Sequence, residues 1–362
     1  MASEQLCICG AAVFPRAVGI DSLYLNAFID GLGINWEALR FEKEKLKLTH
    51  GVTHAEVTLG GETFALHRAG LHLYPLKLSN KAFTLGLSEN MSPHCHAQFS
   101  SHLLWTTGLD AAFGRFCAMW ENVGARMTRP EIVNRVDAAF DFQIGASDFT
   151  TSHFVSQAVK DATWRENQKD QSYQFGRGDV VCRVYDKVAE IEQQSGKAWL
   201  FDIWGVREGV WRCEFQMRGE RLKQYGIGTL DQMKAYLPSA VRHLARNHTS
   251  LRKPGKDSNR SRWPLHLMWH ALLESADQLT QPPNRPPPPL LRGSEYLLSR
   301  QIKSLLGDFK ALAALLSEKR PDDPVSREEL IERLTRLTDP YHSPQLWRSD
   351  VAAKIRKREL GL

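Results

Sequence analysis

The segment CRVYDKVAE at 182–190 groups three side chains that could act on a phosphodiester. In a β-strand, alternation places Arg183, Tyr185 and Lys187 on one face, with a mostly apolar face opposite. A phenolate can attack phosphorus as a covalent nucleophile, and adjacent cations favour the phenolate form. The planar fork of an arginine matches phosphate oxygens. The segment therefore predicts a strand whose polar face can cut a phosphate ester through Tyr185.

Two other segments alternate in the same way and add carboxylates. RVDAAFDF at 135–142 and VWRCEFQMR at 210–218 each offer one apolar face and one charged face. An ordinary solvated sheet face is the simpler alternative, but it does not account for the repeated pairing of carboxylates with arginines. The charged faces carry Arg135, Asp137 and Asp141 in the first segment, and Arg212, Glu214, Gln216 and Arg218 in the second.

The three carboxylates could form a metal site. Asp137 and Asp141 lie roughly 13 Å apart along one strand, too far to share one ion by themselves. One of them together with Glu214 from a neighbouring strand could bind Mg²⁺ or Mn²⁺, which prefer oxygen ligands. In that arrangement the metal neutralises a non-bridging phosphate oxygen, while strand cations such as Arg212 stabilise the developing negative charge.

The elements that position these residues predict an α+β chain with antiparallel strands. Short alternating runs joined by turn residues predict hairpins, and apolar residues at helical spacing predict helices that cover a sheet. The expected elements are hairpins at 55–68 and 70–88, helices at 108–125, about 148–162 and about 229–247, and strands at 131–143, about 171–176, 179–190 and 209–218.

Composition restricts the class of protein. The chain has 362 residues, 42% of them hydrophobic, enough for one large domain with an appendage. Its N-terminus has no basic stretch before a long apolar core, and no apolar run reaches the length of a bilayer span, so we expect a cytoplasmic protein with no membrane partner. Six cysteines without a CxxC pair predict reduced thiols. The net charge of +6 permits a polyanionic partner without requiring one.

Positive charge is concentrated at 242–262, where seven Arg or Lys residues face one Asp at a helix end and in a following loop. A flexible cluster of this kind suits the phosphate backbone of DNA, although charge alone fits a solvated loop equally well. We expect this segment to bind DNA through Arg252, Lys253, Lys256, Arg260 and Arg262, with Arg135, Arg177 and Arg218 adding contacts from the sheet.

The stretch QLTQPPNRPPPPLLRG marks a domain boundary, because consecutive prolines favour a stiff extended linker. We therefore expect a main domain at 1–276, a linker at 277–293 and a helical accessory region at 294–362. Two amphipathic helices are predicted in the accessory region, the second with Ser326 as its cap. The accessory region could contact DNA, a host helicase or a second copy of the chain.

Taken together, RVDAAFDF, FGRGDVVCRVYDKVAE and WRCEFQMR resemble the Rep_trans family of replication initiation factors, and GIDSLYLNAF resembles the first strand of that family. The family includes initiators of rolling-circle plasmids, replication proteins of filamentous phages and relaxases of conjugative elements. The resemblance covers roughly residues 18–250. It implies a strongly curved antiparallel sheet with flanking helices.

The same resemblance implies a metal-dependent endonuclease of the nicking-closing type, similar in chemistry to relaxases and topoisomerases. Such an enzyme nicks one strand of origin DNA, single-stranded or melted, in a bacterial host, and leaves a 5′-phosphotyrosine and a free 3′-OH. Carried over by motif, the nucleophile is Tyr185, flanked by Arg183 and Lys187. The acidic set is Asp137, Asp141 and Glu214.

The sequence departs from the family pattern upstream of Gly176. The family usually has a tyrosine or similar residue two places before this glycine, where this chain has Gln174 next to Tyr173. Tyr173 is therefore a competing nucleophile. GRGD also differs from the usual Gly-Ser-Arg, which shifts the position of Arg177.

Two other functions compete with a tyrosine nickase. In SPHCHAQF, His94 and His96 flank Cys95 in a pattern close to the histidine pair of other rolling-circle nucleases, which would bind a metal through ring nitrogens. Two packing histidines are the simpler interpretation. A protein that binds and melts an origin without cutting it would also use the basic segment, but it would leave Tyr185 and the carboxylates without a role.

Overall fold

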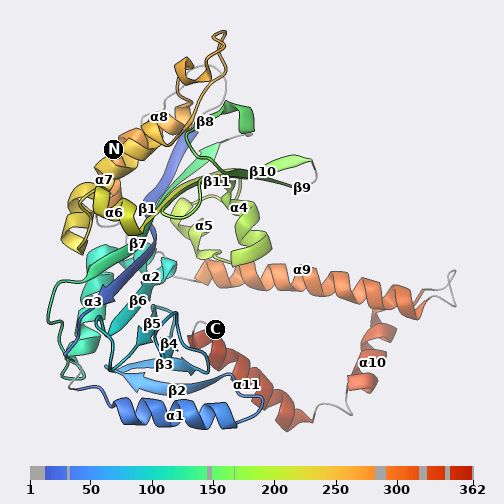
Figure 1. Ribbon diagram of the computed structural model, residues 1–362. Coiled ribbons are helices and arrows are strands. Elements are labelled where there is room, and N and C mark those ends of the chain that lie inside the picture. Colours follow the sequence, from blue (N-terminus) through green and yellow to red (C-terminus); the bar gives the residue numbers. More distant parts are fainter. Residues whose placement is uncertain are drawn as a thin grey trace.

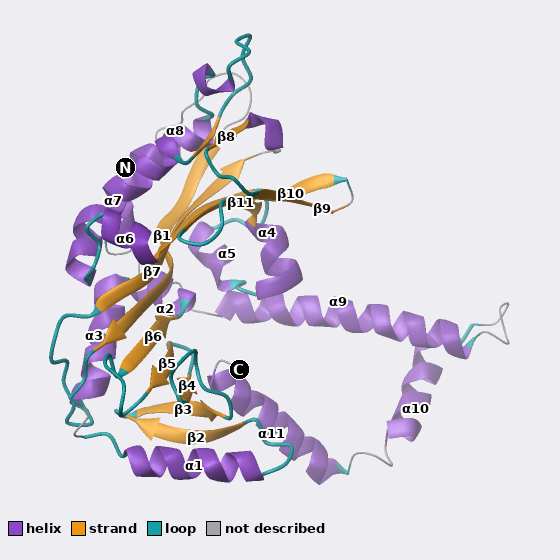
Figure 2. Ribbon diagram, in the orientation of Figure 1, coloured by secondary structure: helices purple, strands orange, loops and turns teal. Residues whose placement is uncertain are grey.

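The computed structural model describes residues 13–30, 33–144, 149–166, 168–281, 291–317, 324–338 and 343–360. Cys7, Cys9 and the centre of the predicted proline-rich linker lie outside these residues. The described chain has the predicted α+β class, with one large antiparallel sheet and a helical C-terminal region (Figures 1 and 2).

The large sheet has eleven strands in the order β2-β3-β4-β5-β6-β1-β7-β12-β11-β10-β9, and it twists along its length (Figure 1). A separate two-stranded sheet joins β8 and β13. The strands are β1 (Val13–Ala27), β2 (His54–Leu59), β3 (Glu62–His67), β4 (Leu76–Ser79), β5 (Phe83–Leu87), β6 (Cys95–Phe99), β7 (Ile132–Ile144), β8 (Phe154–Ser156), β9 (Asp161–Glu166), β10 (Lys169–Phe175), β11 (Val180–Asp186), β12 (Val210–Arg218) and β13 (Thr249–Leu251).

The sheet consists of two halves that meet where β1 pairs with β7. In each half the first strand pairs with the last, β1 with β6 and β7 with β12, and helices follow. The helices are α1 (Trp36–Leu48), α2 (Ser101–Thr107), α3 (Leu109–Glu121), α4 (Lys187–Glu190), α5 (Trp199–Trp204), α6 (Gly219–Gln224), α7 (Leu230–Asn247), α8 (Leu267–Ser275), α9 (Leu291–Leu316), α10 (Arg327–Thr338) and α11 (Pro344–Leu360).

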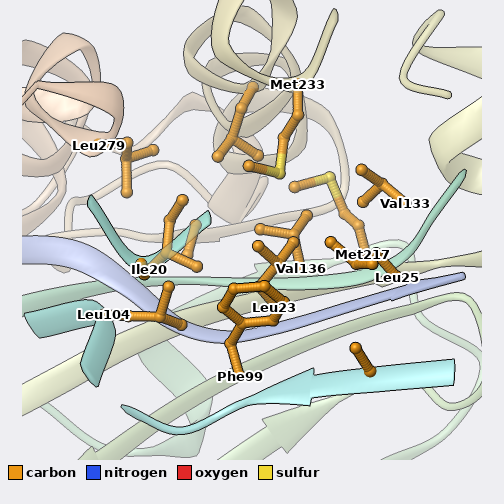
Figure 3. Packing of buried hydrophobic residues seen from close by; sticks show 14 of the residues in the cluster. Ile20, Leu23, Leu25, Phe99, Leu104, Val133, Val136, Met217, Met233 and Leu279 are labelled. Atoms are coloured by element: carbon orange, nitrogen blue, oxygen red, sulfur yellow. The ribbon is translucent and has the colours of Figure 1, made fainter. Parts of the chain in front are cut away.

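The main core lies on the apolar face of the sheet. Figure 3 shows Leu23 of β1, Val136 of β7 and Met217 of β12 packed beneath Met233 of α7. The alternation read from the sequence explains this face, because apolar side chains at every second position of a strand point to the same side of the sheet. Burial of such a continuous apolar layer fixes the register of the strands, and with it the residues of the opposite, polar face.

Local sequence signals account for several predicted elements. The hairpin of β2 and β3 turns at Gly60 and Gly61, whose φ angles of 60° and 80° suit glycine. Helix α7 begins with a capping box formed by Thr229 and Gln232. The predicted cap at Ser326 is confirmed, since its hydroxyl accepts a hydrogen bond from the Glu329 backbone N–H.

Two predictions of local structure were wrong. The helix expected at about 148–162 is absent from the described part of this segment, which contains β8 paired with β13. The strand expected to run to 190 ends at Asp186, because the Asp186 carboxylate caps α4 by accepting from the Ala189 backbone N–H. At the edges of the expected linker, Leu279 is buried in the main core within a 3₁₀ helix, and α9 begins at Leu291.

The C-terminal helix α9 projects away from the sheet, and α10 and α11 lead the chain back toward it (Figure 1). Helix α9 contacts α5, and α11 returns to β3. There Arg356 forms a bidentate ion pair with Glu56 of β2. None of the helices in the described parts of the chain combines the length and apolar character that a bilayer span requires.

Candidate active site

The polar face of the second half brings together Tyr185, Glu214 and Arg183. β11 and β12 pair so that Arg183 lies opposite Glu214, and Tyr185 lies opposite Arg212. The Tyr185 hydroxyl donates to Glu214 Oε2 at 3.2 Å, and Arg183 Nη1 donates to Glu214 Oε1 at 3.0 Å. The carboxylate is 7% exposed, so one buried base holds both the phenol and the guanidinium.

The electrostatics of this group favour a protonated phenol beside a base. Burial, reinforced by the Glu214 carboxylate, raises the pKa of Tyr185 well above its ordinary value. Burial together with Asp137 and Asp21 raises the pKa of Glu214. The expectation that adjacent cations would favour the phenolate was wrong, because burial outweighs the nearby arginine. Tyr185 is therefore a protonated phenol, and the Glu214 carboxylate that accepts its hydrogen bond is a group to which the proton could pass.

Arg212 and Asp141 are brought together in a buried ion network. Arg212 is fully buried and donates through Nε and Nη2 to both oxygens of Asp141, at 2.6 and 2.8 Å. Its Nη1 donates to Asp21 Oδ1 at 2.6 Å. Trp204 Nε1 donates to Asp141 Oδ2 at 2.9 Å. The oxygens of Asp141 are thus occupied by donors from the chain, and this carboxylate positions Arg212.

Asp21 is a buried carboxylate of this network that the sequence did not predict. Its carboxylate also accepts from Ser101, Trp105 and Lys197. Burial alone would raise the pKa of Asp21, but Arg212 and Lys197 outweigh it and hold the pKa well below its usual value. The signal was present in GIDSLYLNAF, but the register shift between Ile20 and Ser22 places Asp21 on the polar face against simple alternation.

Lys187 lies beside the tyrosine, although it belongs to α4 and not to β11. Its ammonium lies 5.5 Å from the centroid of the Tyr185 ring and pairs with Glu190. The side chain is 2% exposed, and burial with nearby Arg212 lowers its pKa. A small second core covers this end of the polar face and excludes water from it; it contains Trp105, Ala139, Ile191, Ala198, Leu200, Phe201, Trp204 and Val210.

Arg135, Asp137 and Arg218 lie toward the other end of β7 and β12. Arg135 forms a bidentate ion pair with Asp137, with Nε to Oδ1 at 2.8 Å, and its guanidinium stacks 4.9 Å from the Tyr24 ring centroid. Arg218 lies opposite Arg135 in the register. Its buried Nε has no hydrogen-bond partner among the described residues. These two arginines are therefore neighbours at one end of the polar face.

The predicted acidic set does not fit a metal site in this arrangement. Asp137 is held by Arg135, Asp141 by Arg212, and Glu214 by Arg183 and Tyr185. Among the residues that the structure describes, no three His, Cys, Asp or Glu side chains are grouped so that they could hold a metal ion. Each carboxylate is instead neutralised by an arginine of the chain.

The alternative residues lie elsewhere. Tyr173 is fully buried in the apolar core, where its hydroxyl donates to Phe149 O and Asp170 Oδ2, and burial raises its pKa. His94 Nδ1 accepts from the Ile29 backbone N–H at 3.4 Å, and His96 Nδ1 lies 2.8 Å from Asn26 Oδ1. Neither histidine joins a metal-type cluster within the described residues. Of Tyr173 and Tyr185, the one on the polar face is therefore Tyr185.

The predicted basic segment lies at one end of the molecule, beyond β8 and β13 (Figure 1). Lys253, Lys256, Arg260 and Arg262 are exposed, as is Arg177 in the β10–β11 turn. Arg252 differs from them: it donates to Ser250 Oγ and Trp263 O, and burial lowers its pKa. Arg252 therefore anchors the loop that carries the other cations.

Comparisons with known proteins add one distant similarity. Neither a family model nor a curated protein matches the chain. A solved structure described as "Structure of Rolling Circle Replication Initiator Protein from Geobacillus stearothermophilus" is 16% identical, with a TM-score of 0.41, over 74% of this chain and 97% of that chain. A TM-score below 0.5 settles neither fold nor activity, so the function must be inferred from the site itself.

Proposed function

We propose that this protein nicks one strand of DNA through Tyr185 and acts as an initiator of rolling-circle replication. The observation that carries the proposal is the contact of the Tyr185 hydroxyl with the buried Glu214 carboxylate, whose other oxygen is held by Arg183. A solvated sheet face does not need a buried carboxylate in contact with a phenol. The resemblance of the three strand motifs to replication initiation factors indicates that the substrate is DNA.

The reaction begins with proton transfer. Glu214 accepts the proton of the Tyr185 hydroxyl as the phenol oxygen attacks phosphorus, which suits a carboxylate whose pKa is raised by burial. The new Oη–P bond replaces the bond from phosphorus to the 3′-oxygen. The 3′-oxygen leaves and takes a proton from solvent, so the products are a 5′-phosphotyrosine and a free 3′-OH. The phosphodiester energy is conserved in the protein–DNA bond, which allows later strand closing.

Cations of the chain stabilise the transition state. Arg183 has 30% of its side chain exposed beside the tyrosine and can reach a non-bridging oxygen. Lys187 adds a buried positive charge over the phenol ring. Arg212 is a positioning residue: it binds Asp21 and Asp141 and so orders the strands beneath the phenol.

The test is covalent capture. The full chain is incubated with single-stranded or stem-loop DNA that contains a candidate origin, with Mn²⁺ and separately with EDTA, and the adduct is mapped by mass spectrometry. We expect a nucleotide mass on the peptide that contains Tyr185. An adduct on another residue, or cleavage without an adduct, would overturn the proposal. Loss of the adduct in EDTA alone would show that a metal joins the site when DNA binds.

A further inference from the structure

A groove lies at the end of β11 that is remote from Tyr185. It is lined by the β10–β11 turn, the segment before β9, helix α6 and the end of α7. The ten lining residues are Ala158, Val159, Lys160, Gly176, Arg177, Gly178, Asp179, Val180, Arg221 and His248. The proposed chemistry at Tyr185 uses none of these residues.

Backbone contacts build this groove from segments far apart in sequence. Gly176 N–H donates to Lys160 O at 2.8 Å, and Gln157 N–H donates to His248 O at 2.8 Å. Gly176 has a φ of 91°, and a Cβ at this position would approach Val180 O to 2.5 Å. A side chain is therefore excluded there, and the turn can lie directly against the His248 ring. The hydrogen bonds and the glycine hold the groove's cations in a fixed relation.

The charge of the groove suits a polyanion. Lys160, Arg177 and Arg221 line it together, against Asp179 as the one carboxylate among the lining residues. Lys160 and Arg177 are exposed, and the exposed cations of the basic loop lie at the same end of the molecule (Figure 1). Clustered cations of this kind bind the phosphates of a nucleic acid backbone.

The residue types in the lining also indicate whether the groove suits a duplex or a single strand. Proteins that hold single strands stack the unpaired bases on aromatic rings. The ten lining residues include no Phe, Tyr or Trp, and the apolar ones are alanine and valine. Such a groove can hold a sugar–phosphate backbone but offers little surface on which a base could stack.

We infer that this groove binds the phosphates of a DNA duplex that leads into the strand cut at Tyr185. The inference rests on the proposed function. Val180 at the groove and Tyr185 are five residue steps apart along β11, which is roughly 17 Å of strand. This length matches about five base pairs of duplex, at 3.4 Å for each step. The groove therefore selects a stem that adjoins the cleavage site.

The experiment measures how affinity depends on stem length. Fluorescent stem-loop DNAs of arbitrary sequence, with stems of 3, 6 and 10 base pairs, are titrated with the full chain carrying Tyr185→Phe, so that binding is read without cleavage. We expect affinity to rise roughly tenfold once the stem exceeds about five base pairs. Adding Lys160→Ala and Arg177→Ala should remove this dependence and lower the slope of log affinity against log salt by about 1.8.

The matched control carries Lys45→Ala and Lys47→Ala, two exposed cations of α1 at the other end of the molecule (Figure 1). It should keep both the stem-length dependence and the salt slope. A Lys160/Arg177 variant that behaves like this control would overturn the inference, whether or not the parent chain nicks DNA. Stem-length dependence without any nicking by the parent chain would retain the groove and refute the proposed function.

Discussion

The two halves of the sheet share a plan and differ in charge. Each half pairs its first strand with its last and buries an equivalent apolar face. Apart from Asp21, which joins the ion network of Arg212, the first half presents Tyr24, Asn26 and His96 on the polar face, whereas the second half presents the ion pair of Arg183 and Glu214. We call the first half without Asp21 the neutral half. The shared plan determines which side chains face the same side, and the residue types determine whether that side can do chemistry.

The polar side chains of the neutral half hydrogen-bond to and contact one another. His96 hydrogen-bonds Asn26 through Nδ1, lies 3.4 Å from Gln98 through Nε2, and its ring contacts Tyr24 and Tyr74. In the second half, Tyr185 has a hydroxyl bonded to a group that can take its proton. If the proposed function is correct, the difference between Tyr24 and Tyr185 is the difference between a packing residue and a nucleophile.

The largest expected effect comes from the two tyrosines. Tyr185→Phe should abolish covalent attachment to DNA, because it removes the attacking oxygen, and DNA affinity should stay within a few-fold of the parent chain. Tyr24→Phe in the other half should leave attachment intact. Both variants are assayed with radiolabelled origin DNA on denaturing gels. Attachment by the Tyr185 variant, or its loss in the Tyr24 variant alone, would reverse the roles of the halves.

Glu214→Gln should slow nicking roughly 10²–10⁴-fold, the usual contribution of a general base. The amide keeps a hydrogen bond to the phenol but cannot accept its proton, so folding and DNA affinity should change little. Because the base acts in its ionised form and its pKa is raised, parent nicking should fall as pH drops through that raised pKa. Gln98→Ala is the control from the neutral half. An unchanged rate in Glu214→Gln would remove the base from the mechanism.

The buried ion network predicts a large difference in stability. Asp141→Ala leaves fully buried Arg212 without its bidentate partner and should lower the free energy of unfolding by about 3–5 kcal/mol. Asn26→Ala removes a hydrogen bond between neutral groups and should cost about 1 kcal/mol. Urea unfolding followed by circular dichroism measures both. Equal losses would mean that Asp21 alone is sufficient to hold the guanidinium.

The sequence predicted the strands of the site well, because alternation in RVDAAFDF, CRVYDKVAE and WRCEFQMR shows directly which face of each strand is apolar. It also placed Tyr185 and Glu214 on the charged faces of their strands. It did not predict Asp21, because a register shift in β1 is set by pairing with β7 and leaves no pattern in β1 itself. The helix expected near 148–162 failed for a similar reason, since pairing of β8 with distant β13 outweighed local spacing.

The spacing of the carboxylates in the sequence also did not predict which groups they contact in the structure. One of Asp137 and Asp141 was expected to share a metal with Glu214, but arginines from the same or adjacent strands bind all three carboxylates. Alternation gives the face of a side chain, whereas its partner depends on register between strands, which one sequence does not specify. The same limit applies to Arg252, whose anchoring contact to Trp263 became visible only in the folded loop.

The buried His96 of the neutral half should make the stability of the protein depend on pH. Burial, aided by His72, lowers the pKa of His96 from 6.5 to about 4. Between pH 6.5 and 4 the unfolded chain binds a proton that the folded chain does not, so stability is full above pH 6.5 and falls as pH drops toward 4. The loss should be roughly 2–3 kcal/mol. His67 titrates in the same window, so His96→Gln should remove only part of the slope. An unchanged profile in His96→Gln would show that its ring is not kept neutral.

The smallest effect concerns surface cations of the second half. Lys253, Lys256, Arg260 and Arg262 should be neutralised together, while Arg252 is kept because it anchors their loop. Phosphate contacts give affinity and carry little sequence information, so binding should weaken alike on origin and random DNA. Each lost contact should lower the slope of log affinity against log salt by about 0.9 on duplex. Nicking of a pre-melted substrate at saturating protein should persist, because the chemistry lies on the polar face.

The matched variant for this loop neutralises four exposed cations of the first half, Arg40, Lys45, Lys47 and Lys81, and should keep the parent slope. Salt titration of both variants on both DNAs decides the question. If the two variants lose the same slope, the field of the whole chain attracts DNA and neither half is specialised for it. If only the loop variant loses slope, the second half holds the backbone at its basic end and cuts at Tyr185, so binding and chemistry share one half of a sheet whose other half supplies packing.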